Sequence, residues 1–223
     1  MKFNIITLYP EFYSNIFKFG IIQRAITQKK LQIEIHSLRD SAIDKRGSID
    51  DSPYGGGAGM ILRVDVLYNA LKKIKETQDT YSIIFSASGK KFNQQKTINF
   101  SKKENITLIC PKFEGFDERI LKFVDIELSI GDFILSSGDY ASLCVLDSVS
   151  RLIPGVLGNN ESLSEESFSD PNLLEYPQYT RPAIFMEEKV PEVLISGDHK
   201  KVEEYRKKES LKKTRKNRSD LLL

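Results

Sequence analysis

The sequence predicts an α/β protein built on a mostly parallel β-sheet with helices on its faces. Strand-length apolar runs alternate with helical patterns over the first 152 residues, which is the rhythm of a parallel sheet. At 223 residues, the chain is long enough to bury a sizeable core. Because ligands of such sheets bind beyond the carboxyl ends of the strands, we expect functional residues in the loops there.

The individual elements follow from the spacing of apolar residues. The segment LQIEIHSL alternates apolar and polar residues as a half-buried strand does, whereas Val64, Leu67, Leu71 and Ile74 have helical spacing. Strands are expected at residues 3–8, 31–38, 82–85, 106–110 and 124–130. Helices are expected at residues 11–29 (with a break near Gly20), 64–75, 94–100, 117–123 and 141–152.

The composition argues against several classes of protein. The chain has no uncharged apolar run of 18 residues, so no membrane span is expected. Its start, MKFNIITLYP, lacks the pattern of a secretory signal, and we expect a cytoplasmic protein. Cys110 and Cys144 are then expected to be buried, reduced thiols, with a disulfide as the alternative. Their spacing does not predict a zinc site.

The composition changes after Gly158. Residues 159–172 are rich in Ser, Glu, Asn and Asp, which predicts an exposed linker between domains at residues 1–158 and 173–223. Residues 199–218 hold ten Lys or Arg and three Glu, a charge of +7, and since the whole chain carries +2 the remainder carries −5. A solvated helix face could explain a basic segment, but this asymmetry favours contact with a polyanion.

Four segments contain residue types suited to chemistry. In DDSPYGGGAGM, residues 50–60, the glycines allow a ligand to approach the backbone. The segment lacks a Walker pattern, so a flexible loop and a binding loop are both open. PKFEGFDER, residues 111–119, and SIGDFILSSG, residues 129–138, suit ligand-lining loops, with a helix-leading turn and a hairpin turn as alternatives. In DSVSRLIPGVLG, residues 147–158, Arg151 ends a helix, where the helix dipole alone favours a cation.

Taken in order, SPYGGGAGM, FEGFDER, SIGDFILSSG, DSVSRLIPGVLG and YPQYTRP resemble the bacterial tRNA (guanine-N1) methyltransferase family. The start ITLYPEF and the late stretch VPEVLISGDH also match, so the resemblance covers nearly the whole chain. It implies a knotted fold of the SPOUT type, which no spacing argument could find because such knots are rare. It also implies a small helical C-terminal domain that holds tRNA, and a homodimer with active sites between subunits.

The implied reaction is transfer of a methyl group from S-adenosylmethionine to N1 of the guanosine at tRNA position 37, next to the anticodon. By the resemblance, Glu166 is the general base, Arg151 stabilises charge on O6, and Glu114 orients the donor or guanine, or holds Mg²⁺. The sequence itself shows no metal ligands. The expected donor-binding residues, on three loops, are Phe85, Ser86, Ala87, Gly89, Pro111, Phe113, Glu114, Gly115, Ser129, Ile130, Gly131, Phe133, Leu135, Ser137, Gly138 and Ala141. The expected RNA-binding residues are Asp50, Tyr54, Gly55, Gly59, Lys207, Lys208, Lys212 and Lys213.

The chain departs from the family pattern mainly in the donor loops. Ser-Ala-Ser-Gly at residues 86–89 replaces the usual Ser-Pro, and Pro111 and Ser137 each replace a glycine. Glu166 stands where aspartate is typical, and Glu165 beside it is the competing base. A non-catalytic RNA-binding member of the same fold is therefore the alternative function. A different α/β nucleotide-binding enzyme is disfavoured, because the dinucleotide and Walker fingerprints are missing.

Overall fold

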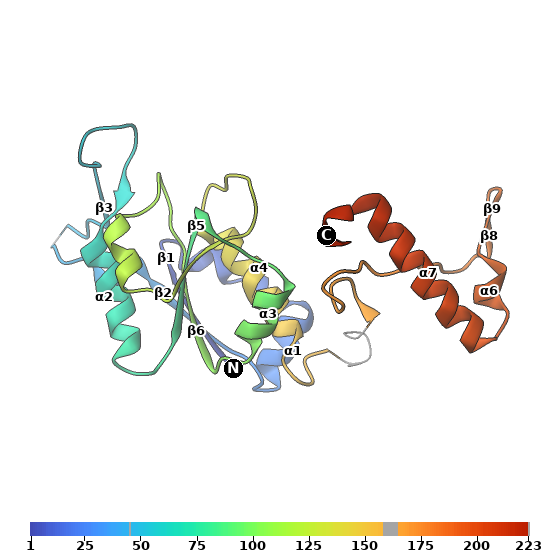
Figure 1. The fold of residues 1–223 in the computed structure, drawn as a ribbon. Coiled ribbons are helices and arrows are strands. Elements are labelled where there is room, and N and C mark those ends of the chain that lie inside the picture. Colours follow the sequence, from blue (N-terminus) through green and yellow to red (C-terminus); the bar gives the residue numbers. More distant parts are fainter. Residues whose placement is uncertain (45, 158–164, 223) are drawn as a thin grey trace. The chain divides into compact units, whose positions relative to one another are not determined.

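The computed structural model describes residues 1–44, 46–157 and 165–222. The chain divides into two compact units, Met1–Gly158 and Asn159–Leu223. The first contains a large sheet with helices, and the second contains one long helix with short elements (Figure 1).

A five-stranded parallel sheet forms the centre of the first unit, with the strand order β2-β1-β6-β5-β7. The strands are β1 (Lys2–Thr7), β2 (Gln32–Ser37), β5 (Tyr81–Lys91), β6 (Asn105–Ile109) and β7 (Ile126–Ser129). The sheet is in register across β1, where Ile5 pairs with Ile35 of β2 and with Leu108 of β6. The predicted α/β class with a parallel sheet is therefore confirmed. The trefoil knot stays a prediction.

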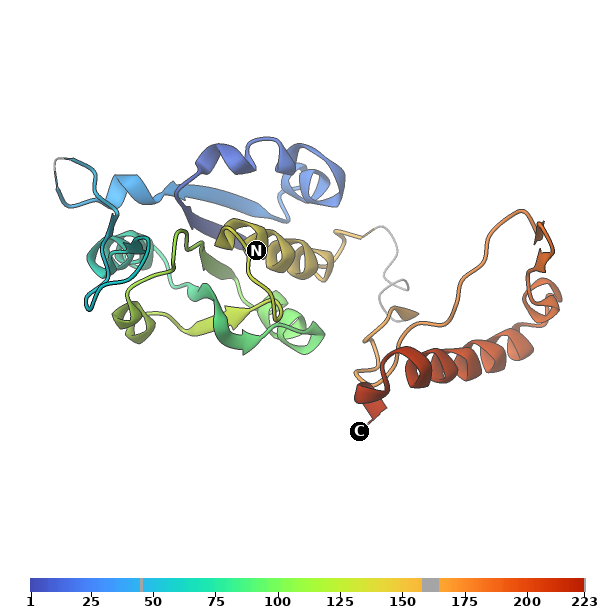
Figure 2. The same cartoon turned by 90° about the horizontal axis from the view of Figure 1, so that it is seen from above.

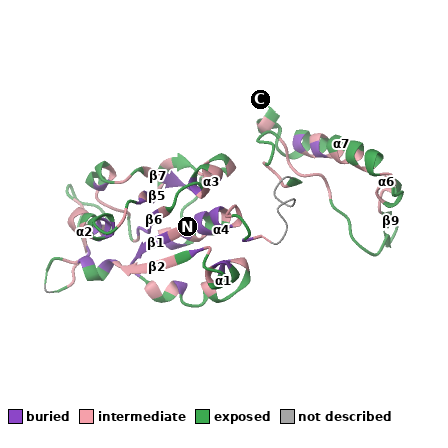
Figure 3. Ribbon diagram, turned by 90° about the horizontal axis from the view of Figure 1, so that it is seen from below, coloured by how far each residue is buried: buried purple, intermediate pink, exposed green. Residues whose placement is uncertain are grey.

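Helices cover both faces of this sheet (Figures 1 and 2). One face packs against α1 (Gly20–Thr27), α3 (Gln94–Ser101) and α4 (Gly138–Arg151), and the other against α2 (Val64–Lys75) and the 3-10 turn η4 (Glu118–Lys122). Successive residues of a strand point to opposite faces, so Ile5 joins the first core and Ile6 the second. Figure 3 shows the resulting burial of the central strands. Burial on both faces explains why these strands are continuous apolar runs.

Several elements differ from the predicted bounds. Residues 11–18 form two 3-10 turns, η1 (Pro10–Tyr13) and η2 (Ile16–Lys18), and α1 starts only at Gly20, whose φ of 68° turns the chain. Residues 117–123 likewise contain the 3-10 turn η4 instead of an α-helix. The strand β5 continues to Lys91 through an irregularity after Phe85. Cys144 is exposed, so the expected burial of both thiols is wrong for this residue.

Two short strands, β3 (Asp50–Asp51) and β4 (Ile61–Leu62), pair antiparallel and close the glycine-rich segment into a loop. The 3-10 turn η3 (Leu38–Ser41) precedes this loop.

The second unit is organised around α7 (His199–Asn217), with β8 (Ile184–Phe185), β9 (Glu188–Lys189), α6 (Glu192–Ile195) and η5 (Ser219–Leu222). One face of α7 holds the preceding chain. The Ser210 hydroxyl donates to the Leu174 carbonyl at 2.6 Å, and the Thr214 hydroxyl accepts from the Leu174 amide at 2.9 Å. Across the described parts of the chain, no helix combines the length and apolar character needed to cross a membrane.

Candidate active site

A pocket of about 230 Å³ lies at the carboxyl ends of β5, β6 and β7 in the first unit. The loops that leave these strands are at the upper edge of the sheet in Figure 1. The volume is a little below the range of about 300–1,000 Å³ that is common for small-molecule sites. The pocket is therefore sized for a small organic ligand that stays partly open to solvent.

Three loops build the pocket and bring together nearly all of the residues expected to bind the donor. The expected residues that line it are Phe85, Ser86, Ala87, Pro111, Phe113, Glu114, Gly115, Ser129, Ile130, Gly131, Phe133, Leu135, Ser137, Gly138 and Ala141. Gly89 is not in the lining. It lies in β5, where a Cβ atom would come within 2.5 Å of the Leu128 backbone, so its absence of a side chain lets β5 and β7 approach.

The lining also includes Lys112, Phe116, Leu128, Ile134 and Ser136, which were not among the expected donor-binding residues. All but Leu128 lie within the segments PKFEGFDER and SIGDFILSSG that were expected to line a ligand site, and Leu128 directly precedes the second segment.

Two contacts join the loop after β6 to the loop after β7. The Gly138 amide donates to the Pro111 carbonyl at 2.8 Å, and the Lys112 ammonium donates to the Ser136 carbonyl at 2.8 Å. Lys112 also lies 5.7 Å from the centre of the Tyr9 ring, a cation–π contact. These contacts hold the two walls of the pocket together on both sides of Ser137.

The backbone of the pocket loops adopts conformations that side chains rarely tolerate. Phe113 has a φ of 60° although it is not glycine, and Gly115 has a φ of 119°. A non-glycine residue in the left-handed region costs about 1–3 kcal/mol, and such residues cluster at ligand sites. In this turn the Gly115 amide donates to the Lys112 carbonyl, and the Gly115 carbonyl accepts from the Leu62 amide, so the turn is fixed against residues 60–62.

A carboxylate supports the third loop, which follows the regular part of β5. Glu127 of β7 accepts hydrogen bonds from the hydroxyls of Ser86 and Ser88, the latter at 2.8 Å. Ser86 lines the pocket. This carboxylate therefore fixes the Ser-Ala-Ser-Gly segment that replaces the usual Ser-Pro.

The glycine-rich loop contacts the pocket through Glu114. The Glu114 amide donates to the Met60 carbonyl at 3.0 Å, and a Cβ atom on Gly59 would lie 2.5 Å from Glu114 Cγ. Tyr54, at the far side of this loop, is fully exposed. Asp50 lies in β3 at the base of the loop, and Gly55 has a φ of 87°. The structure thus brings Gly59 to the pocket, whereas Tyr54 extends into solvent.

An ion pair follows the Glu114 turn. Arg119 Nη2 lies 2.6 Å from Asp117 Oδ2, and this hydrogen bond lowers the pKa of the Asp117 carboxyl. Asp117 also accepts from the Arg119 amide at 3.0 Å and so caps η4. The polar residues of FEGFDER therefore serve in part as the helix-leading turn that was the alternative interpretation.

Arg151 lies at the opposite end of α4 from the pocket. The helix has 14 residues, from Gly138, which lines the pocket, to Arg151. At a rise of about 1.5 Å per residue, its two ends are about 20 Å apart. A single chain therefore does not bring Arg151 to its own pocket.

In the second unit, Glu165 and Glu166 have different surroundings. The Tyr176 hydroxyl donates to Glu165 Oε2 at 2.5 Å, and Arg206 Nη1 lies 3.4 Å from the same oxygen. Burial, and then the hydrogen bond to Glu165, raise the pKa of Tyr176 to about 12. Glu166 is half-buried, and its carbonyl accepts from the Ser169 amide at 3.1 Å. The neighbouring residues 158–164 lie outside the described residues.

The cations on α7 are unequally placed. Lys207, Lys208 and Lys212 are exposed, while Lys213 is half-buried. Lys207 pairs with Glu203 at 2.7 Å and Lys212 with Glu209 at 3.6 Å. The Lys207–Glu203 pair is exposed on both sides, and such pairs contribute little to stability.

The parallel sheet and the pocket at its carboxyl edge define an α/β protein with a ligand site in the usual place for this class. The whole chain, residues 1–223, matches the family described as tRNA (guanine-1)-methyltransferase TrmD, and the chain belongs to this family. This result confirms the family and the methyltransferase class that the motifs predicted.

Individual relatives agree along nearly their full length. The tRNA (guanine-N(1)-)-methyltransferase of Clostridium botulinum (strain Eklund 17B / Type B) is 47% identical over 221 residues, covering 99% of this chain and 92% of the relative. The protein of the same name from Clostridium perfringens (strain SM101 / Type A) is 48% identical over 221 residues, covering 99% and 93%. The one from Sulfurihydrogenibium sp. (strain YO3AOP1) is 46% identical over 223 residues, covering 100% and 87%.

Proposed function

We propose that this protein transfers a methyl group from S-adenosylmethionine to N1 of the guanosine at position 37 of tRNA, in the cytoplasm. The pocket carries this proposal, because the family motifs FEGFDER and SIGDFILSSG meet there with residues 85–87 at the carboxyl edge of the sheet. Membership of the methyltransferase family supports the reaction.

The chemistry of the pocket is compatible with the donor. Ile130, Phe133 and Leu135 offer apolar surface for an adenine ring, and the surrounding loops offer peptide groups for hydrogen bonds. Because many contacts would come from the backbone, the replacement of the family's glycines by Pro111 and Ser137 leaves the peptide groups that would bind the donor in place.

The acceptor sets the chemical requirement. Guanine N1 carries a proton, and it becomes nucleophilic as this proton leaves and negative charge moves onto O6. The bound donor supplies a methyl group on a sulfonium, which needs little activation. We assign proton removal to Glu166, stabilisation of O6 to Arg151 and orientation of the donor or guanine to Glu114. We choose Glu166 over Glu165 by its position in the family pattern; Tyr176 and Arg206 contact the Glu165 carboxylate.

This assignment requires a homodimer. The length of α4 separates Arg151 from the pocket of its own chain by about 20 Å, so we propose that Arg151 and Glu166 act at the donor pocket of the partner. We further propose that α7 and the glycine-rich loop contact the anticodon stem-loop of tRNA. The lysines of α7 would bind phosphates.

A resident Mg²⁺ site receives no support. Within residues 1–44, 46–157 and 165–222, no three His, Cys, Asp or Glu side chains gather as metal ligands would. Mg²⁺ held by Glu114 would therefore take its other ligands from water and substrate.

The reaction is tested with labelled donor and unmodified tRNA, followed by nucleoside analysis. The wild type should form N1-methylguanosine, and Glu166→Gln should lower the single-turnover rate about 10²–10⁴-fold, while donor and tRNA still bind. Glu165→Gln is the matched control and should retain most activity. If Glu165→Gln is inactive and Glu166→Gln is not, the base is Glu165. If the wild type binds tRNA but never methylates it, the protein is the non-catalytic alternative.

A further inference from the structure

Asp139 is a buried carboxylate next to the donor pocket that the proposed chemistry does not use. It lies in the first turn of α4 and is only 3% exposed. Three hydroxyl groups from three segments donate to it: Thr7 Oγ1 at 2.6 Å, Tyr13 at 2.8 Å, and Ser137. Burial of a charge is costly unless hydrogen bonds satisfy it, and the N-terminus of α4 adds favourable dipoles.

The direction of the hydrogen bonds around Tyr13 follows from counting protons. A hydroxyl has one proton, and Tyr13 gives it to Asp139. Ser142 Oγ likewise donates its proton to the Asp139 carbonyl at 2.7 Å, so the Tyr13 oxygen accepts from Cys110 Sγ at 3.5 Å. Burial raises the pKa of both Tyr13 and Cys110. Both groups therefore keep their protons at neutral pH, and the donation to Asp139 persists.

The network reaches the pocket on two routes. Ser137, which donates to Asp139, lines the pocket together with Gly138. A Cβ atom on Gly138 would lie 2.7 Å from Pro111 Cδ, so this wall has little tolerance for movement. On the second route, Thr7 Oγ1 accepts from the Tyr9 amide at 3.0 Å, and the Tyr9 ring lies against Lys112, which holds the Ser136 carbonyl.

We propose that Asp139 is a positioning residue for the methyl donor. Its carboxylate ties the end of β1, the turn η1 and the start of α4 together, and thereby fixes the wall at residues 137–141 against Pro111. This inference rests on the proposed function, because it takes the pocket to be the donor site. Loss of the carboxylate, or of one hydroxyl donor, weakens donor binding and leaves tRNA binding intact.

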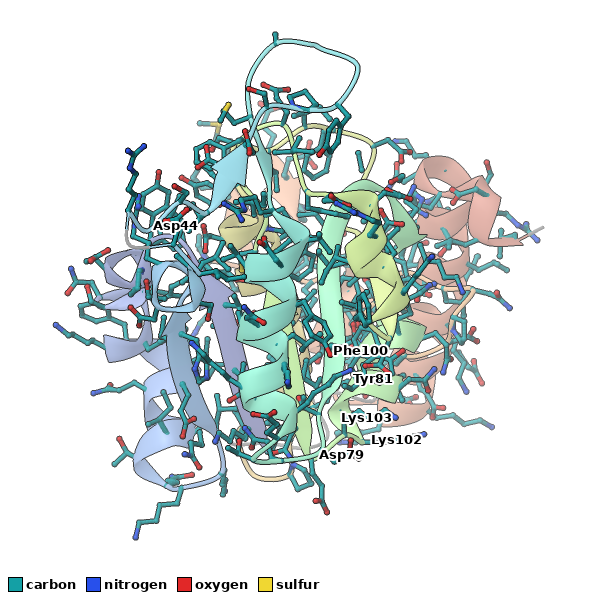
Figure 4. All side chains as sticks on the ribbon, turned by 90° about the vertical axis from the view of Figure 1, so that its left-hand side faces the viewer. Asp44, Asp79, Tyr81, Phe100, Lys102 and Lys103 are labelled. Atoms are coloured by element: carbon teal, nitrogen blue, oxygen red, sulfur yellow. The ribbon has the colours of Figure 1, made fainter. Side chains whose placement is uncertain are left out.

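The test is calorimetric binding of S-adenosylhomocysteine to the full chain. Asp139→Asn should raise the Kd at least about tenfold, and the isosteric variants Thr7→Val and Tyr13→Phe about three- to tenfold each. The KM for the donor should rise in proportion, with kcat at saturating donor within about threefold of wild type. Asp79→Asn is the charge-matched control: Asp79 is exposed before the first residue of β5, at the end of the sheet away from the glycine-rich loop (Figure 4).

The readouts separate positioning from simple stabilisation. A purely structural role would lower the melting temperature and the binding stoichiometry, which counts folded molecules, but would leave the Kd unchanged. If Asp139→Asn does not fold, Thr7→Val and Tyr13→Phe decide the question. Wild-type Kd values in the folded variants would overturn the proposal. If the wild type binds neither S-adenosylhomocysteine nor the donor, the proposed donor site is wrong and the role of Asp139 falls with it.

Discussion

Replacing Gly59 by alanine should displace Glu114 and reduce methyl transfer. A Cβ atom at this position would lie 2.5 Å from Glu114 Cγ and 2.8 Å from Glu114 Oε1, so the carboxylate would have to move. The φ of Gly59 is 78°, and the left-handed conformation costs an alanine about 1–2 kcal/mol in addition. The substitution thus has a backbone cost and a separate effect on Glu114.

Gly56 offers a matched control for the backbone cost. Its φ is 81°, and a Cβ atom there would meet nothing within 4 Å. Both alanine variants therefore share the strain, and only Gly59→Ala moves Glu114. A lost hydrogen bond to a charged group is worth about 1.5–3 kcal/mol, so kcat/KM for Gly59→Ala should fall about 10- to 100-fold below that of Gly56→Ala.

The assay is methyl transfer to an unmodified tRNA transcript at subsaturating concentrations, with thermal melting curves for both variants. Similar melting temperatures and the expected difference in kcat/KM would support a role for Glu114 in orienting the donor or guanine. Equal activity of the two variants would refute that role, because the displaced carboxylate would then contribute nothing to the transition state.

Two further predictions concern the second unit. Changing Lys207, Lys208, Lys212 and Lys213 to Gln should weaken tRNA binding, measured by filter binding at several salt concentrations. The slope of log affinity against log salt concentration should become shallower by about 0.9 for each phosphate that the protein no longer neutralises. An unchanged slope would mean that α7 is a solvated helix without phosphate contacts. The pKa of Tyr176 is raised to about 12, above the ordinary value of about 10, so its contribution to stability is complete below pH 10 and is lost as the pH rises towards 12. The free energy of unfolding of Tyr176→Phe, followed by urea denaturation, should decline less over this range than that of the wild type, since only the other tyrosines with a raised pKa, such as Tyr13, still contribute. A decline equal to that of the wild type would contradict the assignment.

Periodicity predicted the fold well where local pattern and packing agree. The bounds of α2 match the expected residues 64–75, because apolar residues at helical spacing are also the ones that pack on the sheet. The predicted elements were wrong where contacts between residues distant in sequence determine the local structure. Residues 11–18 have helical spacing but form 3-10 turns. There Tyr13 enters the core and donates to Asp139, a contact across 126 positions of sequence.

The motifs predicted most of the residues that line the pocket, because its walls are continuous segments of chain. Its supporting contacts were not, since they join residues that are distant in sequence, such as Lys112 with Ser136 and Ser86 with Glu127. Gly89 shows the opposite case, a residue that the motifs assigned to the pocket although it does not line it. A glycine that lets two strands approach and a glycine that lets a ligand approach look the same in a motif, and only the position of Leu128 separates them.

The role assigned to Arg151 depends on a second copy of the chain, because no movement within one copy supplies it. Val145, Leu146 and Val149 of α4 are fully buried in the core of the first unit, so the helix cannot slide towards the pocket without loss of that packing. Each of these side chains contributes about 1.5–3 kcal/mol by burial, and a shift of about 20 Å, the length of the helix, would expose all of them. Closure of a loop over the pocket could not deliver the guanidinium either, since Arg151 belongs to the helix and not to a loop. A monomer would leave Arg151 as a cation favoured by the helix dipole, with no part in the chemistry.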